Sequence, residues 1–241
     1  MSLTSADARE ARMRPTGSPL VISGGASGLG AAIAAAGAAA GFEPILFDRV
    51  AGDGTCESHV VDVSRTREVE RAVAEVVARH GGLGAVVTCA AIDACGTLED
   101  VPAEAWERVV AVNLLGTAAL VRAALPHLVR SPGRIVTVAS TLGLRAFSDA
   151  TAYCASKFGV VGFTRALAAE LTGRVGVTLL IPGGMRTHFF DGRADQYRPA
   201  ADAQLNPPAE VAEAVLFALT RPPGCEVREL VVCPATEPSW P

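Results

Sequence analysis

Short apolar runs alternate along the chain with longer segments whose apolar residues recur at the period of a helix. Leu20–Ile22 and Ala85–Val87 have the length of buried strands, whereas residues 65–80 place Val69, Val73 and Val76 on one helical face. Strands that alternate with helices in this way are typical of a parallel sheet covered by helices on both faces. The pattern therefore predicts an α/β fold with a doubly wound, seven-stranded parallel sheet.

The pattern also places the individual elements. Strands are predicted at 20–22, 44–47, 59–61, 85–87, 134–138, 175–181 and 229–233, and helices at 28–40, 65–80, 103–115 and beyond, 151–171 and 208–219. The connection at about 187–206 is long and polar, as substrate-binding loops and lids often are. No linker or repeat divides the chain, so we expect residues 18–241 to form one domain and residues 1–17 a flexible leader.

Composition and charge exclude several classes of protein. Of the 241 residues, 50% are hydrophobic and 19% charged, and the net charge of −4 gives no basic surplus for binding nucleic acid. The first 19 residues lack the apolar core of a secretory signal, and no uninterrupted apolar run reaches membrane length. The six cysteines lack C-x-x-C pairs and the four histidines lack ligand spacing. We therefore expect a cytoplasmic protein with reduced thiols, no metal and no membrane partner.

A glycine-rich segment, SGGASGLG at 23–30, joins the first predicted strand to the first predicted helix. Its glycines permit a tight turn, close approach of a pyrophosphate and close packing of the helix, whose N-terminus faces the phosphates. The alternative is an ordinary strand–helix turn, but the flanking elements are those that a dinucleotide site requires. We predict cofactor contacts from Ser23, Gly24, Ser27, Gly28, Leu29 and Gly30.

Acidic residues end the second and third predicted strands. Asp48 follows Gly30 by 18 residues, where a carboxylate accepts hydrogen bonds from a ribose diol and repels a 2′-phosphate. NAD is therefore favoured over NADP, although Arg49 would be able to stack on adenine or approach a phosphate. Asp62 ends the third strand, where the adenine edge would lie. The alternatives are a surface carboxylate for Asp48 and a helix cap for Asp62, with Ser64 as the better cap.

Tyr153 and Lys157 stand four residues apart on a predicted helix, and hence on one face. Lys157 is the only lysine among 21 basic residues, and Tyr153 is one of two tyrosines. An ammonium about 4 Å from a phenol contributes roughly 4 kcal/mol at an effective dielectric near 20, which would lower the phenol pKa from about 10 to about 7. The pair is thus a candidate general acid/base; the alternative is a solvated helix face.

Other polar and aromatic residues flank this pair in the sequence. Ser140 ends the fifth predicted strand, where its hydroxyl would hold a substrate oxygen, or would serve as a cap or turn residue. Asn113 lies within a helix that it disfavours, so it either binds a water at a local break or lies exposed on the outer face. An apolar substrate pocket and ordinary core or lid packing are equal alternatives for Leu142, Phe147, Phe189 and Phe190. Arg145, Arg186 and Arg193 keep an anionic substrate group possible.

Together these residues resemble the short-chain dehydrogenase/reductase family in its compact single-domain branch, from about Pro19 to Pro234. Residues 23–30 are similar to the family's T-G-x3-G-x-G, with Ser23 in place of Thr, and residues 112–116 contain its N-x-x-G around Asn113. Ser140, Tyr153 and Lys157 match its catalytic set. Residues 182–187 match P-G-x3-T, whose threonine contacts the nicotinamide carboxamide.

The resemblance implies a Rossmann fold and an NAD-dependent oxidoreductase that moves a hydride between nicotinamide and a secondary alcohol or ketone. Tyr153 is then the acid/base, Lys157 lowers its pKa and binds the nicotinamide ribose, Ser140 orients the substrate and Asn113 supports a proton-relay water. A homo-oligomer, tetramer or dimer, built partly from the tyrosine-bearing helix is also implied. Further cofactor contacts fall on Val63, Cys89, Ala90, Ala91, Pro182, Gly183, Met185 and Thr187.

One motif departs from the family. Its N-N-A-G appears here as Thr88-Cys89-Ala90-Ala91. We expect Thr88 still to form a hydrogen bond, and the packing to change without loss of cofactor binding. Two other functions are weighed: a nucleotide-sensing or scaffold protein without chemistry, and an epimerase or dehydratase. The intact Ser/Tyr/Lys set disfavours the first, and the short C-terminal region disfavours the second.

Overall fold

The computed structural model describes residues 17–240, so the predicted leader lies almost wholly outside the described residues. One parallel sheet of seven strands has the order β3-β2-β1-β4-β5-β6-β7, which confirms the predicted fold class. Observed element ends agree with the predicted ones to within two residues. The strands are β1 (Ser18–Ser23), β2 (Phe42–Asp48), β3 (Glu57–Val60), β4 (Ala85–Thr88), β5 (Arg134–Val138), β6 (Gly176–Pro182) and β7 (Glu229–Val232).

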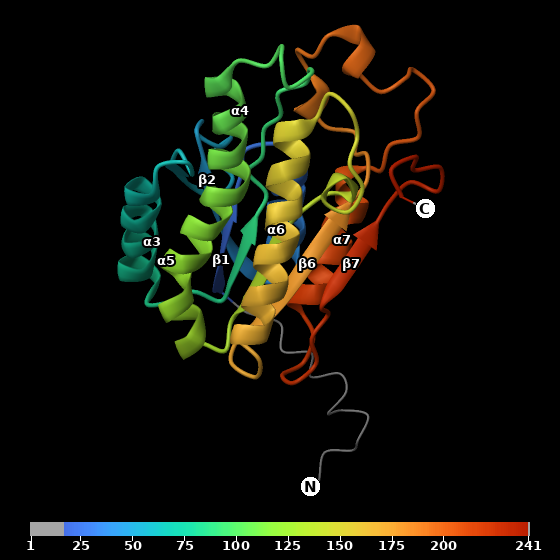
Figure 1. Cartoon of the computed structure of the whole chain (residues 1–241). Helices are drawn as coiled ribbons and strands as arrows, with labels where there is room; N and C mark the ends of the chain where they lie inside the picture. The colour runs from blue at the N-terminus through green and yellow to red at the C-terminus, as the bar shows by residue number, and fades with distance from the viewer. Residues whose placement is uncertain (1–16, 241) are drawn as a thin grey trace, which may run out of the picture.

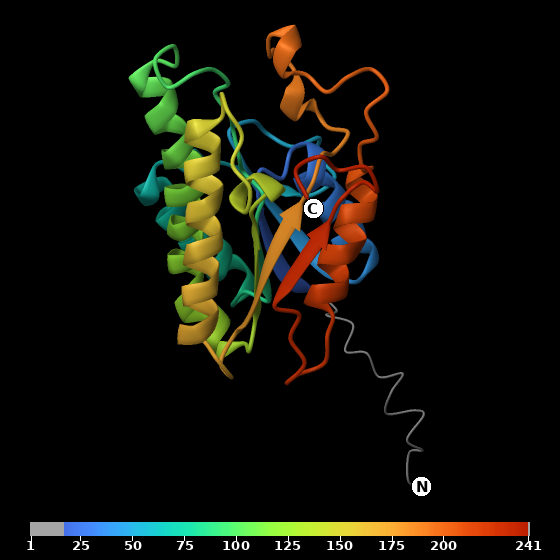
Figure 2. The same cartoon turned by 45° about the vertical axis from the view of Figure 1, so that its right-hand side comes forward.

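Helices cover both faces of the sheet (Figures 1 and 2). On one face lie α2 (Gly28–Ala39) and α7 (Pro208–Leu219); on the other lie α3 (Thr66–His80), α4 (Ala103–Val110), α5 (Thr117–Arg130) and α6 (Thr151–Glu170). The apolar face of α3 packs onto the sheet beside α5, and α2 packs beside α7. The central strands are therefore buried on both sides, as their unbroken apolar runs predict.

The Ala-rich helix α2 shows why small residues suit a doubly wound sheet. A Cβ added at Gly37 would lie 2.9 Å from Leu20 Cδ2, so the helix rests directly on β1. Its buried residues include Ile33 and Ala34, which share a core with Ile22. Close packing of this helix fixes its N-terminus at the carboxyl end of β1, where the glycine-rich turn lies.

The helix predicted to start at residue 103 is continuous to Arg130 but contains one wider turn. Residues Ala111–Gly116 form a π-helical turn between α4 and α5, and Asn113 lies within it. A turn of this kind is rare and is often found at functional sites. The predicted local break around Asn113 is therefore present.

The stretch Ala103–Arg130 is long and apolar enough to cross a membrane, by length and composition only. Its most apolar 18-residue window has a mean hydropathy of 1.7, and half of that window is buried in the protein. The core helices of water-soluble proteins have the same properties, so this stretch is weak evidence for a membrane span.

The strand order reverses between β1 and β4, which opens a crevice at the carboxyl edge of the sheet. Above this edge lies the lid loop (residues 187–206), which carries short 3₁₀ turns at His188–Phe190 and Asp195–Tyr197 (Figure 2). Its two ends are joined at the base, because Arg186 N donates to Asn206 O at 2.9 Å and Asn206 N donates to Gly184 O at 3.0 Å. The lid loop therefore leaves the body of the protein and returns to it at the same place, above the crevice.

Candidate active site

The glycine-rich turn packs against the end of β4 without room for side chains. Gly24 and Gly28 have φ of +68° and +53°, which L residues rarely adopt. A Cβ at Gly24 would lie 2.8 Å from Ala90 Cα, and one at Gly30 would overlap the Gly24 carbonyl oxygen. Ser27 precedes α2 in extended conformation and makes no side-chain cap, so the first N–H groups of α2 stay available to an anion.

The segment after β6 closes the other side of this turn. A Cβ on Gly28 would touch Thr187 Cγ2 at 3.4 Å, although the two residues are far apart in the sequence. Pro182 ends β6 in a buried position, and Met185 packs onto the core beneath α2. The two loops therefore form a cradle in which a pyrophosphate would lie at α2 and a nicotinamide near Thr187, and a side chain at Gly24 or Gly30 would clash with its backbone.

The carboxylate at the end of β2 lies against the cradle. Asp48 Oδ2 accepts a hydrogen bond from Ala26 N at 3.0 Å, inside the glycine turn, while Arg49 is exposed. Asp48 is thus placed beside the position that a ribose would take in this cradle. Leu29, predicted as a cofactor contact, buries its side chain in the core, so only its backbone faces the turn.

Asp62 has protein partners for both carboxylate oxygens. Oδ1 accepts from Ser64 Oγ at 2.7 Å, and Oδ2 accepts from Arg108 Nη2 at 2.7 Å. Burial would raise the pKa of Asp62, but these hydrogen bonds outweigh it and hold the pKa below its ordinary value. The alternative cap assignments are wrong, because α3 begins at Thr66 after Arg65, which makes no side-chain cap. Val63 packs its side chain against Gly116 of the π-helical turn.

The carboxyl end of β5 and the start of α6 bring together three side chains, those of Ser140, Tyr153 and Lys157. Tyr153 is 9% exposed and Lys157 is 3% exposed, so the alternative of a solvated helix face is wrong. Lys157 Nζ donates to Val138 O at 2.9 Å and lies 5.6 Å from the centroid of the Tyr153 ring. Ser140 Oγ accepts from Leu142 N at 3.1 Å, so it also caps the short turn that follows β5.

Burial changes the electrostatics that the sequence predicted. It raises the pKa of Tyr153 well above its ordinary value, although a hydrogen bond with Ser140 acts in the opposite direction. It lowers the pKa of Lys157 from 10.5 to about 8, because the ammonium loses its hydration. The expectation that Lys157 alone brings the phenol pKa near 7 is therefore wrong. In this structure desolvation of the phenolate has the largest influence on the pKa of Tyr153, and the opposing hydrogen bond with Ser140 has a smaller one.

Asn113 is fully buried, so the alternative of an exposed outer-face residue is also wrong. Its Oδ1 accepts from Ile92 N at 2.9 Å, and its Nδ2 donates to Ile92 O at 2.9 Å and to Ser156 Oγ at 3.0 Å. Ser156 in turn donates to Tyr153 O. The amide thus ties the loop after β4 to α6, and its role toward a relay water stays a prediction.

The hydrogen bonds of the segment Thr88–Ala91 differ from those that the sequence predicts. Thr88 Oγ1 is buried and has no hydrogen-bond partner within residues 17–240, so the expectation that it forms a hydrogen bond is wrong. The neighbouring strands are tied instead by Ser23, which accepts from Cys89 N through its carbonyl and from Ala90 N through its hydroxyl at 3.3 Å. Burial raises the pKa of Cys89 to about 12, so this thiol stays neutral.

Of the predicted substrate residues, Phe189 and Leu142 lie beside Tyr153 and Ser140, whereas Phe147 is exposed. The centroid of the Phe189 ring lies 5.7 Å from that of Tyr153 and 5.7 Å from that of Phe190, so the start of the lid loop contacts the Tyr153 phenol. Leu142 is half-buried two residues after Ser140, to whose hydroxyl its N–H donates. Phe147, by contrast, is 43% exposed and packs under Arg145, at 5.8 Å.

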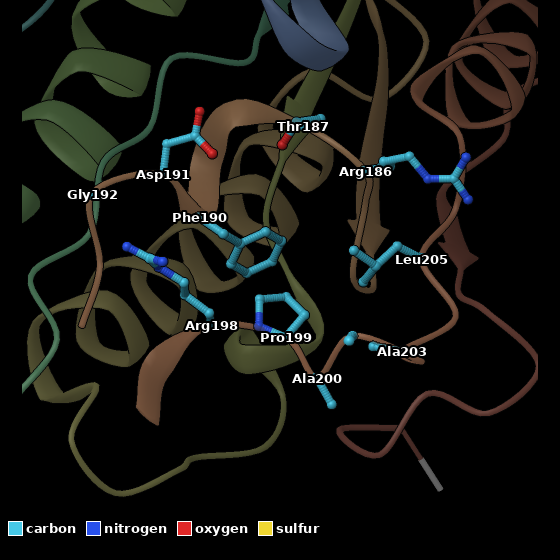
Figure 3. Close-up of a pocket in the computed structure, with 11 residues that line it drawn as sticks. Arg186, Thr187, Phe190, Asp191, Gly192, Arg198, Pro199, Ala200, Ala203 and Leu205 are labelled. Carbon is cyan, nitrogen blue, oxygen red and sulfur yellow. The ribbon is translucent and has the colours of Figure 1, made fainter. Parts of the chain in front are cut away.

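A cavity of about 750 Å³ lies within the lid loop (Figure 3). Phe190 projects into its centre, while the guanidinium groups of Arg186 and Arg198 point away from one another. Thr187 also lines it, so the cavity borders the cofactor cradle. It is lined by Arg186, Thr187, Phe190, Asp191, Gly192, Arg198, Pro199, Ala200, Ala201, Ala203 and Leu205.

Three residues beside the site, Asp93, Arg193 and Glu237, belong to no sequence motif. Asp93, in the loop after β4, pairs with Arg193 of the lid loop, with 3.1 Å between Oδ2 and Nη2. Glu237, near the C-terminus, accepts from Gly184 N at 2.7 Å and so braces the loop that carries Thr187. Arg193 drew attention only by its nearness in sequence, and the other two act across separations that no local pattern reveals.

This cradle beside a buried Ser/Tyr/Lys set defines an oxidoreductase of the nicotinamide-dependent class. The family described as short chain dehydrogenase matches residues 19–198. The chain belongs to this family, and its members use nicotinamide cofactors.

Relatives and solved structures carry varied substrate names. The chain is 31% identical to L-fucose dehydrogenase of Mus musculus, over 93% of this chain and 90% of that protein. It is 35% identical to D-beta-hydroxybutyrate dehydrogenase of Rhizobium meliloti, over 71% and 72% respectively. An alcohol dehydrogenase of Thermococcus sibiricus, solved with 5-hydroxy-NADP, superposes with a TM-score of 0.81 at 28% identity, covering 89% of this chain and 95% of that one.

Proposed function

We propose that this protein is an NAD-dependent oxidoreductase that transfers a hydride between nicotinamide and a secondary alcohol or its ketone. The observation that carries the proposal is the buried set of Ser140, Tyr153 and Lys157 beside the glycine cradle. When bound there, the cofactor would supply the hydride donor or acceptor and, in its oxidised form, a positive charge. Relatives named as dehydrogenases of fucose and of hydroxybutyrate support this reaction type.

Each side chain has a distinct role in this proposal. Tyr153 takes the proton from the alcohol oxygen during oxidation and returns it during reduction. The Ser140 hydroxyl donates a hydrogen bond to the same oxygen and stabilises the charge that develops on it. Lys157, with a pKa of about 8, is mostly cationic at neutral pH and so lowers the free energy of the phenolate. It would also bind the nicotinamide ribose.

NAD is the cofactor that Asp48 favours. Its carboxylate is held against the glycine turn by Ala26 N, where it would accept hydrogen bonds from ribose hydroxyls and repel a 2′-phosphate. Arg49 is exposed at the adjacent position. Parallel assays of the wild-type protein with NADH and NADPH test this assignment, and a preference for NADPH would contradict it.

The test of the reaction is Tyr153→Phe, assayed against secondary alcohols and ketones by the absorbance of reduced nicotinamide. We expect kcat to fall by about 10³-fold, in the range of general acid–base catalysis, with NADH affinity and thermal stability nearly unchanged. Normal turnover by this variant would refute the role of Tyr153. Wild-type protein that binds NADH but reacts with no substrate would support the scaffold alternative. Isomerised product without net change in NADH would support an epimerase.

A further inference from the structure

Arg193 reaches from the lid loop into the catalytic site. Its guanidinium carbon lies 4.7 Å from the centroid of the Phe189 ring and 4.8 Å from that of Phe190. Phe189 in turn contacts the Tyr153 ring. The Arg193 side chain is only 15% exposed, so its guanidinium has exchanged most of its water for two aromatic rings and one carboxylate.

The hydrogen-bonding capacity of this guanidinium is largely unused. Nη2 lies 3.1 Å from Asp93 Oδ2, but it is a buried nitrogen without an aligned hydrogen-bond acceptor in the described part of the chain. A guanidinium carries five N–H donors in a planar fork, and buried donors are nearly always satisfied. Asp93 is itself fixed, because its Oδ1 accepts from Ala94 N at 2.7 Å. The fork is therefore held in place with donors to spare.

The charge around the phenol favours an anionic partner. Lys157 is a buried cation and Arg193 a mostly buried one, and both interact electrostatically with Asp93, whose side chain is 8% exposed. These three groups together carry one positive charge in excess, to which an oxidised nicotinamide would add another. A substrate carboxylate would neutralise this surplus and would accept two parallel hydrogen bonds from the fork. A neutral alcohol would leave both the charge and the donors unmatched.

We propose that Arg193 binds a carboxylate of the substrate, so that this enzyme acts on a short hydroxy acid and its keto acid. The inference rests on the proposed function, because it places the reacting carbon at Tyr153 and the acid group at Arg193. Asp93 is the positioning residue that orients the guanidinium. Closure of the lid loop and recognition of the acid are then coupled, because Arg193 belongs to the loop.

Calorimetric titration of the NADH complex with butyrate and with butyramide tests the inference. The two probes have the same carbon chain and nearly the same size, differ in charge and in one acceptor replaced by an NH2 donor, and do not react. We expect butyrate to bind at least about tenfold more tightly, and Arg193→Gln to weaken butyrate binding by about 30-fold while leaving butyramide unchanged. Arg193→Lys, which keeps the charge but loses the fork, should fall between. Arg174→Gln, an exposed arginine between α6 and β6 at the opposite edge of the sheet, is the matched control and should behave as wild type.

The outcomes separate this inference from the proposed function. Equal or undetectable binding of the two probes by wild-type protein, or an equal loss of both in Arg193→Gln, would overturn the carboxylate site. The latter result would mark Arg193 as a latch for the lid loop. If either of these binding results were obtained, turnover of neutral ketones with NADH would still leave the proposed function intact. Absence of hydride transfer with every acid and every neutral ketone would refute the proposed function itself.

Discussion

The glycine end and the tyrosine end of the carboxyl edge are built by different physical means. The glycine end, from residues 23–30 to Ala90 and Thr187, is shaped by backbone packed so closely that side chains are excluded. The tyrosine end buries a lysine, a tyrosine and an ion pair between Asp93 and Arg193. The first end can bind by shape while remaining well packed, whereas the second must hold charge away from water.

This difference predicts opposite effects on stability. Close packing contributes to the folded state, so changes at the glycine end should damage folding and binding together. A buried charge lowers stability, so removal of charge from the tyrosine end should stabilise the fold while it abolishes activity. Substitutions at the two ends therefore distinguish the contribution of packing from that of buried charge.

The largest effect is expected for Gly30→Ala. The new Cβ would overlap the Gly24 carbonyl oxygen, a backbone atom that cannot move without opening the turn. We expect loss of NADH binding and a decrease of about 3 kcal/mol or more in the free energy of unfolding. Fluorescence titration with NADH and urea unfolding would measure the two effects.

Gly192 of the lid loop is the matched comparison. It has φ of +74°, but a Cβ there would meet nothing within 4 Å. Gly192→Ala should therefore destabilise by only about 1 kcal/mol, the strain of the left-handed backbone. Gly30 lies in α2 and has no positive φ, so a loss in Gly30→Ala no larger than that in Gly192→Ala would contradict exclusion of side chains at the glycine end.

The next effect is the pH dependence of Lys157→Met. The folded-state pKa of Lys157 is about 8 against 10.5 when unfolded, so folding disfavours its charged form. The resulting loss of stability is absent above about pH 10.5, grows as pH falls toward 8 and is complete below 8, where it reaches ~3 kcal/mol. Methionine removes this loss but leaves Val138 O without its donor. We expect the variant to be inactive, yet about 2 kcal/mol more stable at pH 7.

Urea unfolding of the cofactor-free protein at several pH values between 7 and 10 would measure this difference. Groups other than Lys157 titrate in both proteins and cancel. The advantage of the variant should shrink as pH rises and vanish near pH 10. An advantage that is constant with pH would show that packing of methionine, not the buried charge, is responsible.

The sequence predicted what depends on local pattern. The alternation of apolar runs and helical segments predicted the parallel sheet, and the glycines of residues 23–30 predicted the turn that Gly24 and Gly28 make with positive φ. It did not predict what depends on burial. The raised pKa of Tyr153 arises from desolvation that spacing alone does not show. The pairing of Asp93 with Arg193 joins segments about a hundred residues apart, and only the folded chain brings them together.

The smallest effect lies where the two ends meet, at Thr88 of β4. Its hydroxyl is buried without a partner among residues 17–240, whereas its register neighbour on β5, Thr137, shares a 2.7 Å hydrogen bond with Thr164. Thr88→Val replaces an unsatisfied hydroxyl with a methyl group of similar size, so it should stabilise the protein by about 1 kcal/mol. Thr137→Val should destabilise it by a similar amount, because it leaves Thr164 with one partner fewer. Thermal unfolding of both variants measures the sign. Destabilisation by Thr88→Val would mean that an ordered water already satisfies this hydroxyl, and the boundary between the two ends would then be better satisfied than its protein contacts alone indicate.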